Sequence, residues 1–138
     1  MPKLKSKKIL APEKQFLAFP DHYVNLPGKI AFAELAKLAT TDADTYGEKS
    51  GKVIARGTLV HMDADGNVTK PTFTAAAADD GTKANAVLFN TIDIEDYDAV
   101  TDPYVNASIL VHGFVRKDRL LGDKDAIEFS DLIHVVNK

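Results

Sequence analysis

Two kinds of residue in the second half of the chain could do chemistry, a run of carboxylates and a histidine that follows it. The segment 93–103 has five acidic and no basic residues. Its acidic residues are Asp93, Glu95, Asp96, Asp98 and Asp102. Paired carboxylates can hold a divalent cation or transfer protons. One hypothesis is therefore a small β-barrel ligand-binding module or enzyme that uses the acidic loop 93–102 and His112.

Neither group comes with a supporting motif. The four histidines (22, 61, 112 and 134) are too far apart to give metal-ligand spacing on one element. No serine stands in a nucleophile elbow, and the glycines are scattered singly, without a phosphate-binding loop. Charge runs between strands are mostly solvated loops, and a strand histidine is usually half-buried with one hydrogen bond. We therefore expect no catalytic residue, no metal and no cofactor.

Composition excludes several other classes of protein. The chain has 138 residues, enough for one domain with a sizeable core, and 45% of them are hydrophobic. It has no cysteine, which excludes a disulfide framework, a thiolate metal site and a cysteine nucleophile. A net charge of −3 argues against nucleic acid as a partner. No apolar run is long enough for a signal peptide or a membrane span, so we expect synthesis in the cytoplasm and no membrane partner.

The elements that must position these residues are mostly strands. The apolar runs Ala86–Phe89 and Ala107–Val115 flank the acidic loop and predict a strand on each side of it. A further strand is predicted over Lys52–Val60, with Gly57 as a bulge or a point of close approach. Asp65-Gly66 predicts a hairpin turn, and the segment 133–136 predicts a closing strand.

One segment gives two predictions. Phe32, Leu35, Ala36 and Ala39 have helical spacing and predict a short amphipathic helix. The alternative is a strand over Lys29–Ala33. Together with the strands above, this pattern predicts a mainly β domain with one or two short helices.

The first 25 residues read as an extended arm, followed by a single β-rich domain over 26–138. Prolines at 12, 20 and 27 disfavour a helix or a central strand here. The apolar residues of the arm need a surface to cover. Two interpretations remain open: the arm covers one side of the domain's own core, or it becomes ordered on a partner.

The order of these segments resembles the head-decoration, or capsid-stabilising, proteins of tailed bacteriophages. The resemblance rests on five stretches of sequence and is strongest over Val111–Leu121. The stretches are GKVIARGTLV from residue 51, DGNVT from 65, AVLFN from 86, ASILVHGFVRKDRL from 107 and LIHVV from 132.

The resemblance implies a fold, a partner and a location. The fold would be a small β-sandwich or barrel-like domain of the β-tulip type with an extended N-terminal arm. The protein would be a homotrimer that binds the major capsid protein at local three-fold positions on the outer capsid surface and stabilises the mature head. It would be a virion protein made in the host cytoplasm, with no enzyme activity and no small-molecule substrate. The expected capsid-binding residues of the arm are Phe16, Leu17, Phe19 and Tyr23.

Overall fold

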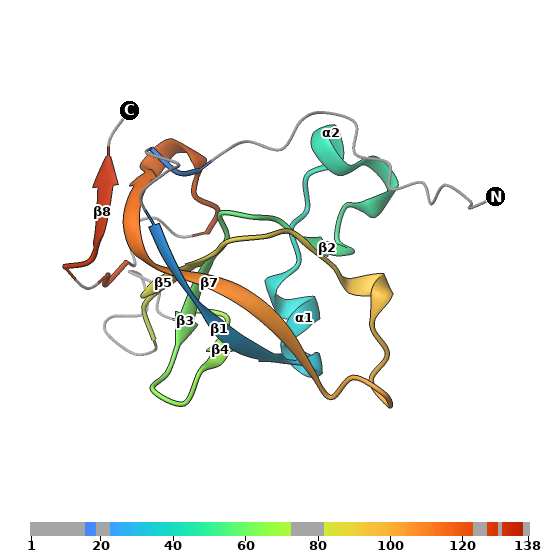
Figure 1. The fold of residues 1–138 in the computed structure, drawn as a ribbon. Helices are drawn as coiled ribbons and strands as arrows, with labels where there is room; N and C mark the ends of the chain where they lie inside the picture. The colour runs from blue at the N-terminus through green and yellow to red at the C-terminus, as the bar shows by residue number, and fades with distance from the viewer. Residues whose placement is uncertain (1–15, 19–22, 73–81, 123–126, 130, 137–138) are drawn as a thin grey trace.

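Strands that are far apart in the sequence close into a ring. The computed structural model describes residues 16–18, 23–72, 82–122, 127–129 and 131–136. Among these residues, five strands pair in the circular order β1-β4-β3-β5-β7-β1 (Figure 1). They are β1 (Tyr23–Ala31), β3 (Leu59–Met62), β4 (Asn67–Thr69), β5 (Ala86–Leu88) and β7 (Tyr104–Arg116). The ring is a small β-barrel, and the expected mainly β, barrel-like fold is confirmed.

All pairings in the ring are antiparallel except that of β1 with β4. The β3–β4 hairpin has the predicted turn, in which the Asp63 carboxylate accepts hydrogen bonds from the backbone N–H groups of Asp65 and Asn67, both at 2.9 Å. A sixth strand, β8 (Ile133–Val136), lies parallel to the end of β7 and extends the sheet beyond the ring. A separate pair, β2 (Val53–Ile54) with β6 (Ile92–Asp93), lies beside the barrel.

The strand β5 and the parts of β3 and β7 beside it, Leu59–Val60 and Ile109–Leu110, are buried on both faces. Ile109 of β7 belongs to the interior of the barrel, whereas its neighbour Leu110 belongs to a second apolar cluster on the outside. Adjacent residues of a strand point to opposite faces, so one strand serves both cores. This explains why Ala107–Val115 reads as a continuous apolar run instead of an alternating one.

The predicted helix forms, and it follows a strand. Helix α1 (Phe32–Leu38) starts where β1 ends and closes the barrel interior with Leu35 and Leu38. Ala36, which the helical pattern assigned to the buried face, is exposed. Both alternatives for this segment were partly right, because the strand runs to Ala31 and the helix begins at Phe32.

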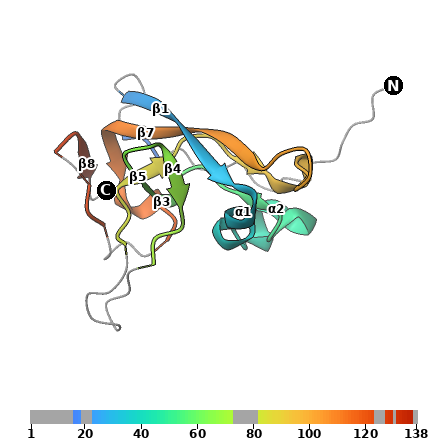
Figure 2. The ribbon, with the colours of Figure 1, turned by 90° about the horizontal axis from the view of Figure 1, so that it is seen from below.

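A second helix was missed by sequence analysis. Helix α2 (Ala43–Tyr46) lies in the polar segment 40–51. The Asp42 side chain accepts hydrogen bonds from the N–H groups of Asp44 and Thr45, as an N-cap does. Figure 2 shows both helices on one side of the molecule and β1 with β7 on the opposite side. No described helix is long and apolar enough to cross a membrane.

Two predictions about strands need correction. The segment Lys52–Val60 is not one strand but β2, a turn and the start of β3. Gly57 has a φ of +87° there, and a Cβ at this residue would lie 3.0 Å from the Arg119 carbonyl oxygen, so the predicted close approach is confirmed. The predicted arm ends earlier than residue 25, since β1 begins at Tyr23 and includes Pro27.

Pro27 fits in β1 because of the direction its nitrogen faces. Two residues later, the Lys29 N–H donates to the Gly66 carbonyl, away from β7. Backbone groups alternate in direction along a strand, so the Pro27 nitrogen also faces away from β7. A proline is tolerated where its nitrogen has no ladder partner.

Candidate interaction surface

The first two acidic side chains of the loop form ion pairs with lysines. Asp93 ends β6, and Glu95 lies in the 3₁₀ turn that follows (Ile94–Asp96). Both lie beside a second 3₁₀ turn (Gly47–Lys49). Lys49 Nζ lies 3.2 Å from Asp93 Oδ2 and also contacts the Glu95 carboxylate. Lys52 Nζ lies 3.6 Å from Glu95. The hydrogen bond from Lys49 lowers the pKa of Glu95 below its usual value, and the same bond raises the pKa of Lys49.

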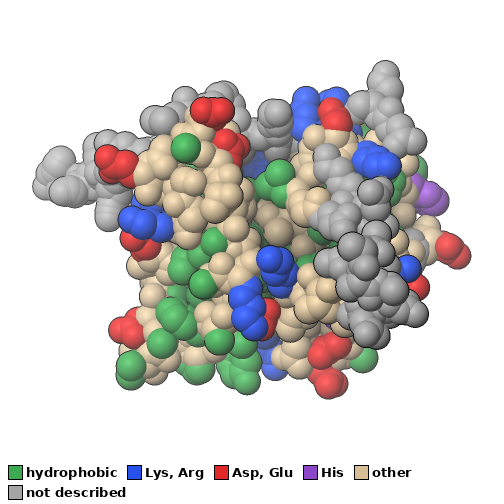
Figure 3. All heavy atoms as spheres, turned by 180° about the vertical axis from the view of Figure 1, so that it is seen from behind, with side chains coloured by type: hydrophobic (Ala, Val, Ile, Leu, Met, Phe, Trp, Pro, Cys, Tyr) green, Lys and Arg blue, Asp and Glu red, His purple; other side chains and the backbone are tan. Residues whose placement is uncertain are grey.

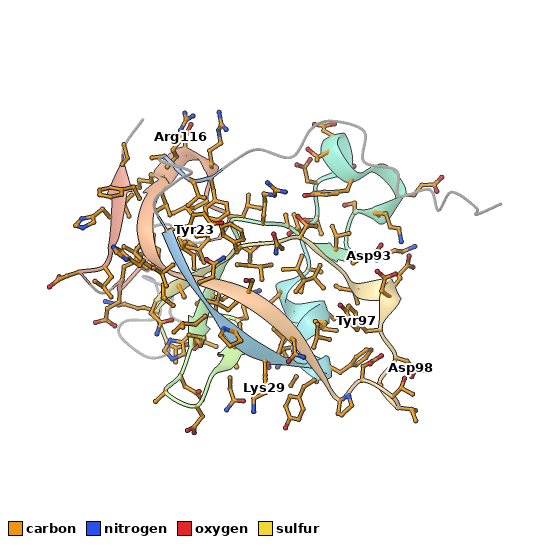
Figure 4. The ribbon with its side chains drawn as sticks, in the orientation of Figure 1. Tyr23, Lys29, Asp93, Tyr97, Asp98 and Arg116 are labelled. Atoms are coloured by element: carbon orange, nitrogen blue, oxygen red, sulfur yellow. The ribbon has the colours of Figure 1, made fainter. Side chains whose placement is uncertain are left out.

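The other end of the loop uses its carboxylates to fix its own backbone. Asp98 Oδ1 accepts from the Val100 N–H at 2.9 Å, and Asp102 Oδ2 accepts from the Asp98 N–H at 3.0 Å. Figure 4 shows Asp93, Tyr97 and Asp98 along one side of the molecule. Within the described residues, no three metal-ligating side chains are grouped. The arrangement holds two turns together by ion pairs and Asx-type hydrogen bonds.

His112 lies far along β7 from the acidic loop. It is half-buried and pairs with Val24 of β1, next to a bulge in the β1–β7 ladder. Eight residues separate it from Tyr104, where the loop ends, and each strand residue rises about 3.3 Å. The structure therefore does not bring His112 and the acidic loop together as one site.

Two other histidines have identifiable structural contacts. The His134 ring stacks on Phe114, with ring centroids 5.0 Å apart. His61 Nδ1 lies 3.0 Å from the Lys83 carbonyl oxygen. The His61 contact matches the expectation of a half-buried strand histidine with one hydrogen bond, whereas His134 is exposed and its contact is a ring stack.

The expected capsid-binding residues of the arm lie in different environments. Phe16 and Leu17 are buried in the outer apolar cluster, with exposures of 1% and 4%. The segment is held to β7 by bonds from Ala18 N–H to the Phe114 carbonyl and from Arg116 N–H to the Phe16 carbonyl, at 2.8 and 2.7 Å. In this conformation Phe16 and Leu17 cover the domain's own core, the first of the two interpretations. Phe19 lies outside the described residues.

Tyr23 is partly open to solvent. It is 42% exposed, and its ring packs on Phe89, with centroids 4.7 Å apart. Val24 and Leu26 beside it are each 47% exposed. The start of β1 thus carries three apolar side chains near the surface. Of these three, the sequence analysis named only Tyr23 as a candidate binding residue.

A second exposed group, here called the Tyr104 surface, consists of Lys29, Val100 and Tyr104. Tyr104 is 56% exposed and Val100, in the acidic loop, is 88% exposed. Lys29 Nζ lies 5.7 Å from the centre of the Tyr104 ring, within cation–π range. Figure 3 shows, from behind, that hydrophobic side chains gather at the end of the molecule that carries α1 and the acidic loop. Exposed tyrosine is typical of protein interfaces.

Comparisons with family models, curated proteins and solved structures give no significant match to this chain.

Proposed function

We propose that this chain is a structural virion protein that binds the outer surface of a tailed-phage capsid and stabilises the mature head. It acts as a homotrimer at local three-fold positions, and its partner is the major capsid protein. The observation that carries the proposal is the Tyr104 surface, in which an exposed tyrosine of β7 lies under a lysine of β1 and the loop before β7 exposes a valine.

The Tyr104 surface suits a contact with another protein. Tyr104 is anchored at the start of β7, and Lys29 is on the neighbouring strand β1, in a ladder of nine paired residues. The loop that carries Val100 is fixed by the carboxylates of Asp98 and Asp102. A rigid surface loses little conformational entropy on binding, so more of the contact energy appears as affinity.

The arm contributes to the proposal in a changed form. Phe16 and Leu17 pack on the barrel, so a capsid contact by the arm is assigned to Phe19 and to the residues before Phe16, which lie outside the described residues. Three such arms on a trimer bind together, and weak single contacts then multiply into firm attachment.

Binding to heads tests the proposal. Mature heads of the phage that encodes the chain, stripped of decoration protein, are mixed with the purified protein and sedimented. We expect saturable binding that Tyr104→Ala and Val100→Ser weaken at least tenfold. Lys37→Ala, which removes an exposed side chain of α1, is the matched control and should bind as the unmodified chain does. No sedimentation with heads would overturn the proposal.

A further inference from the structure

We propose that copies of this chain associate head to tail by main-chain pairing between β8 of one copy and the start of β1 of the next. The two segments are Ile133–Val136, here called the β8 edge, and Tyr23–Leu26, here called the β1 edge. Each is four residues long and has no charged side chain. This inference describes how the copies of the proposed homotrimer contact each other, and in that respect it rests on the proposed function.

The β8 edge has backbone groups that face away from the sheet. The Gly113 N–H donates to the Leu132 carbonyl, and Gly113 is in register with Ile133. In a parallel ladder this arrangement turns Leu132 and His134 toward β7, and turns the N–H and C=O groups of Ile133 and Val135 outward. Among the described residues, β8 pairs with β7 alone, and Figures 1 and 2 both show it at the periphery.

Among the described residues, the β8 edge lacks the features that normally protect an edge strand. Proteins block such edges with lysine, proline or a covering segment. This edge has the sequence Ile-His-Val-Val, and Leu132 and Val135 are 53% and 38% exposed. An uncharged edge with exposed apolar side chains is suited to accept another uncharged strand.

The β1 edge offers such a strand. β4 pairs with β1 at Lys29 and Ile30, so the residues before Pro27 extend past the β3–β4 hairpin. Since the Lys29 N–H faces β4, the backbone groups of Asn25 face the same way by alternation. Pro27 has no N–H to donate and so ends the segment that can pair. Val24 and Leu26 supply exposed apolar side chains, as Leu132 and Val135 do on the β8 edge.

The positions of the two edges determine the kind of assembly. Near Gly113, β1 pairs with one side of β7 and β8 with the other, so the two edges lie on opposite sides of one sheet. β1 is antiparallel and β8 parallel to β7, so a copy that continues the sheet brings its β1 edge antiparallel to the β8 edge. Antiparallel pairing is the more stable mode. Head-to-tail contacts of this kind close into rings when the rotation between copies permits.

The first test changes one backbone donor at a time. Val135→Pro removes an outward N–H of β8 and leaves the bonds to β7, whereas Val135→Thr keeps the donor and nearly the same shape. Asn25→Pro removes an outward N–H of β1. Sedimentation velocity should show an oligomer of the 15.0 kDa chain for the unmodified protein and Val135→Thr. Each proline variant should associate at least tenfold more weakly.

Mixing the two proline variants tests whether the contact is head to tail. Each variant retains one intact edge, so an equimolar mixture should form a 1:1 dimer that neither forms alone. If Asn25→Pro associates as the unmodified chain does, β8 pairs with a second β8 and the proposal is overturned. A monomer at every concentration also overturns it.

Two control variants separate a loss of pairing between copies from a loss of folding and from a loss of head binding. If Asn25→Pro fails to fold by circular dichroism, Val24→Lys places a charge on the β1 edge instead and is expected to dissociate the oligomer. Val100→Ser belongs to the Tyr104 surface and should leave association unchanged while weakening head binding. The assay uses the protein alone, so its failure is separate from failure to bind heads.

Discussion

Gly28 is the residue at which the barrel interior leaves no room for a side chain. A Cβ at this position would lie 2.7 Å from Val68 Cγ2 and 2.8 Å from Ile109 Cγ1. Both neighbours are buried in the interior, on β4 and β7, and cannot move into solvent. β1 therefore approaches its two neighbouring strands closely at a residue without a side chain.

Replacing Gly28 by alanine should destabilise the protein. Overpacking a core costs about 1–3 kcal/mol, and the added methyl group meets two fixed branched side chains. Urea denaturation measures the free energy of unfolding. Gly51→Asn is the control, because the space around Gly51 is open and asparagine tolerates its φ of +83°. Equal stability of Gly28→Ala and the unmodified chain would contradict the close contact between β1 and the interior.

The ion pairs of Glu95 make a pH-dependent contribution to stability. Its pKa in the folded protein is lowered from the usual 4.5, first by the hydrogen bond from Lys49. The folded state is therefore stabilised by this group above pH 4.5, and the contribution is lost as the pH falls through the folded pKa.

Glu95→Gln should lower the thermal midpoint at pH 7, and the difference from the unmodified chain should shrink toward pH 3. The loss at pH 7 is expected to be small because the carboxylate is about half exposed. Calorimetry across this range measures it. Glu48→Gln removes the same charge from the neighbouring turn and serves as the control. If the difference in thermal midpoint between Glu95→Gln and the unmodified chain grows as the pH falls, the ion pair does not stabilise the folded protein in this way.

At the scale of elements, the segment 16–18 acts as part of the sheet. It bonds to β7 on the same side as β1, through an antiparallel bridge between Leu17 and Val115. The Phe16 ring packs edge-on against Phe89 and lies near Gly57, where a side chain would be crowded. A short stretch of the predicted arm thus completes the outer apolar cluster.

Phe16→Ala should destabilise the isolated protein by about 3–5 kcal/mol, the usual cost of truncating a buried phenylalanine. No capsid is needed for the effect, because the cavity forms in the chain's own core. Chemical denaturation measures it. Tyr104→Ala, an exposed aromatic residue, should change stability by no more than about 0.5 kcal/mol. If both variants behave alike, the segment is not packed as described.

At the scale of the whole molecule, a closed barrel is joined to a sheet with two edges that pair with no further strand among the described residues. In the barrel the last strand pairs with the first, and this closure favours a rigid scaffold. The β1 and β8 edges retain outward backbone groups at one end, and the Tyr104 surface stands toward the other end of β7. Self-association and capsid binding can therefore use separate surfaces.

Two deletions separate the roles of the N-terminal residues. Removing residues 1–11 should leave the thermal midpoint within a few degrees of that of the unmodified chain, since Phe16 and Leu17 remain in the core. The same deletion should weaken head binding. Removing residues 1–20 should unfold the domain at ordinary temperature, because two buried side chains are lost. Calorimetry and co-sedimentation with heads measure the two effects. Full head binding by the shorter deletion would show that the arm is not an anchor.

The sequence alone determined the character of the fold through local patterns. Apolar runs and the Asp-Gly turn located β5, β7, β8 and the β3–β4 hairpin, because short apolar runs and turn chemistry are properties of neighbouring residues. The helical spacing from Phe32 located α1, although the alanine at 36 is exposed. The acidic residues were identified as a surface loop, and the structure gives four of them roles in ion pairs and turns.

Only the tertiary structure decided what depends on distant partners. The break in Lys52–Val60, the inclusion of Pro27 in β1 and the burial of Phe16 each depend on a strand or turn more than 30 residues away. The closure of the ring and the two open edges depend on every strand at once. Local sequence records whether a segment is extended and apolar, but the partner that covers it is chosen by the packing of the whole chain.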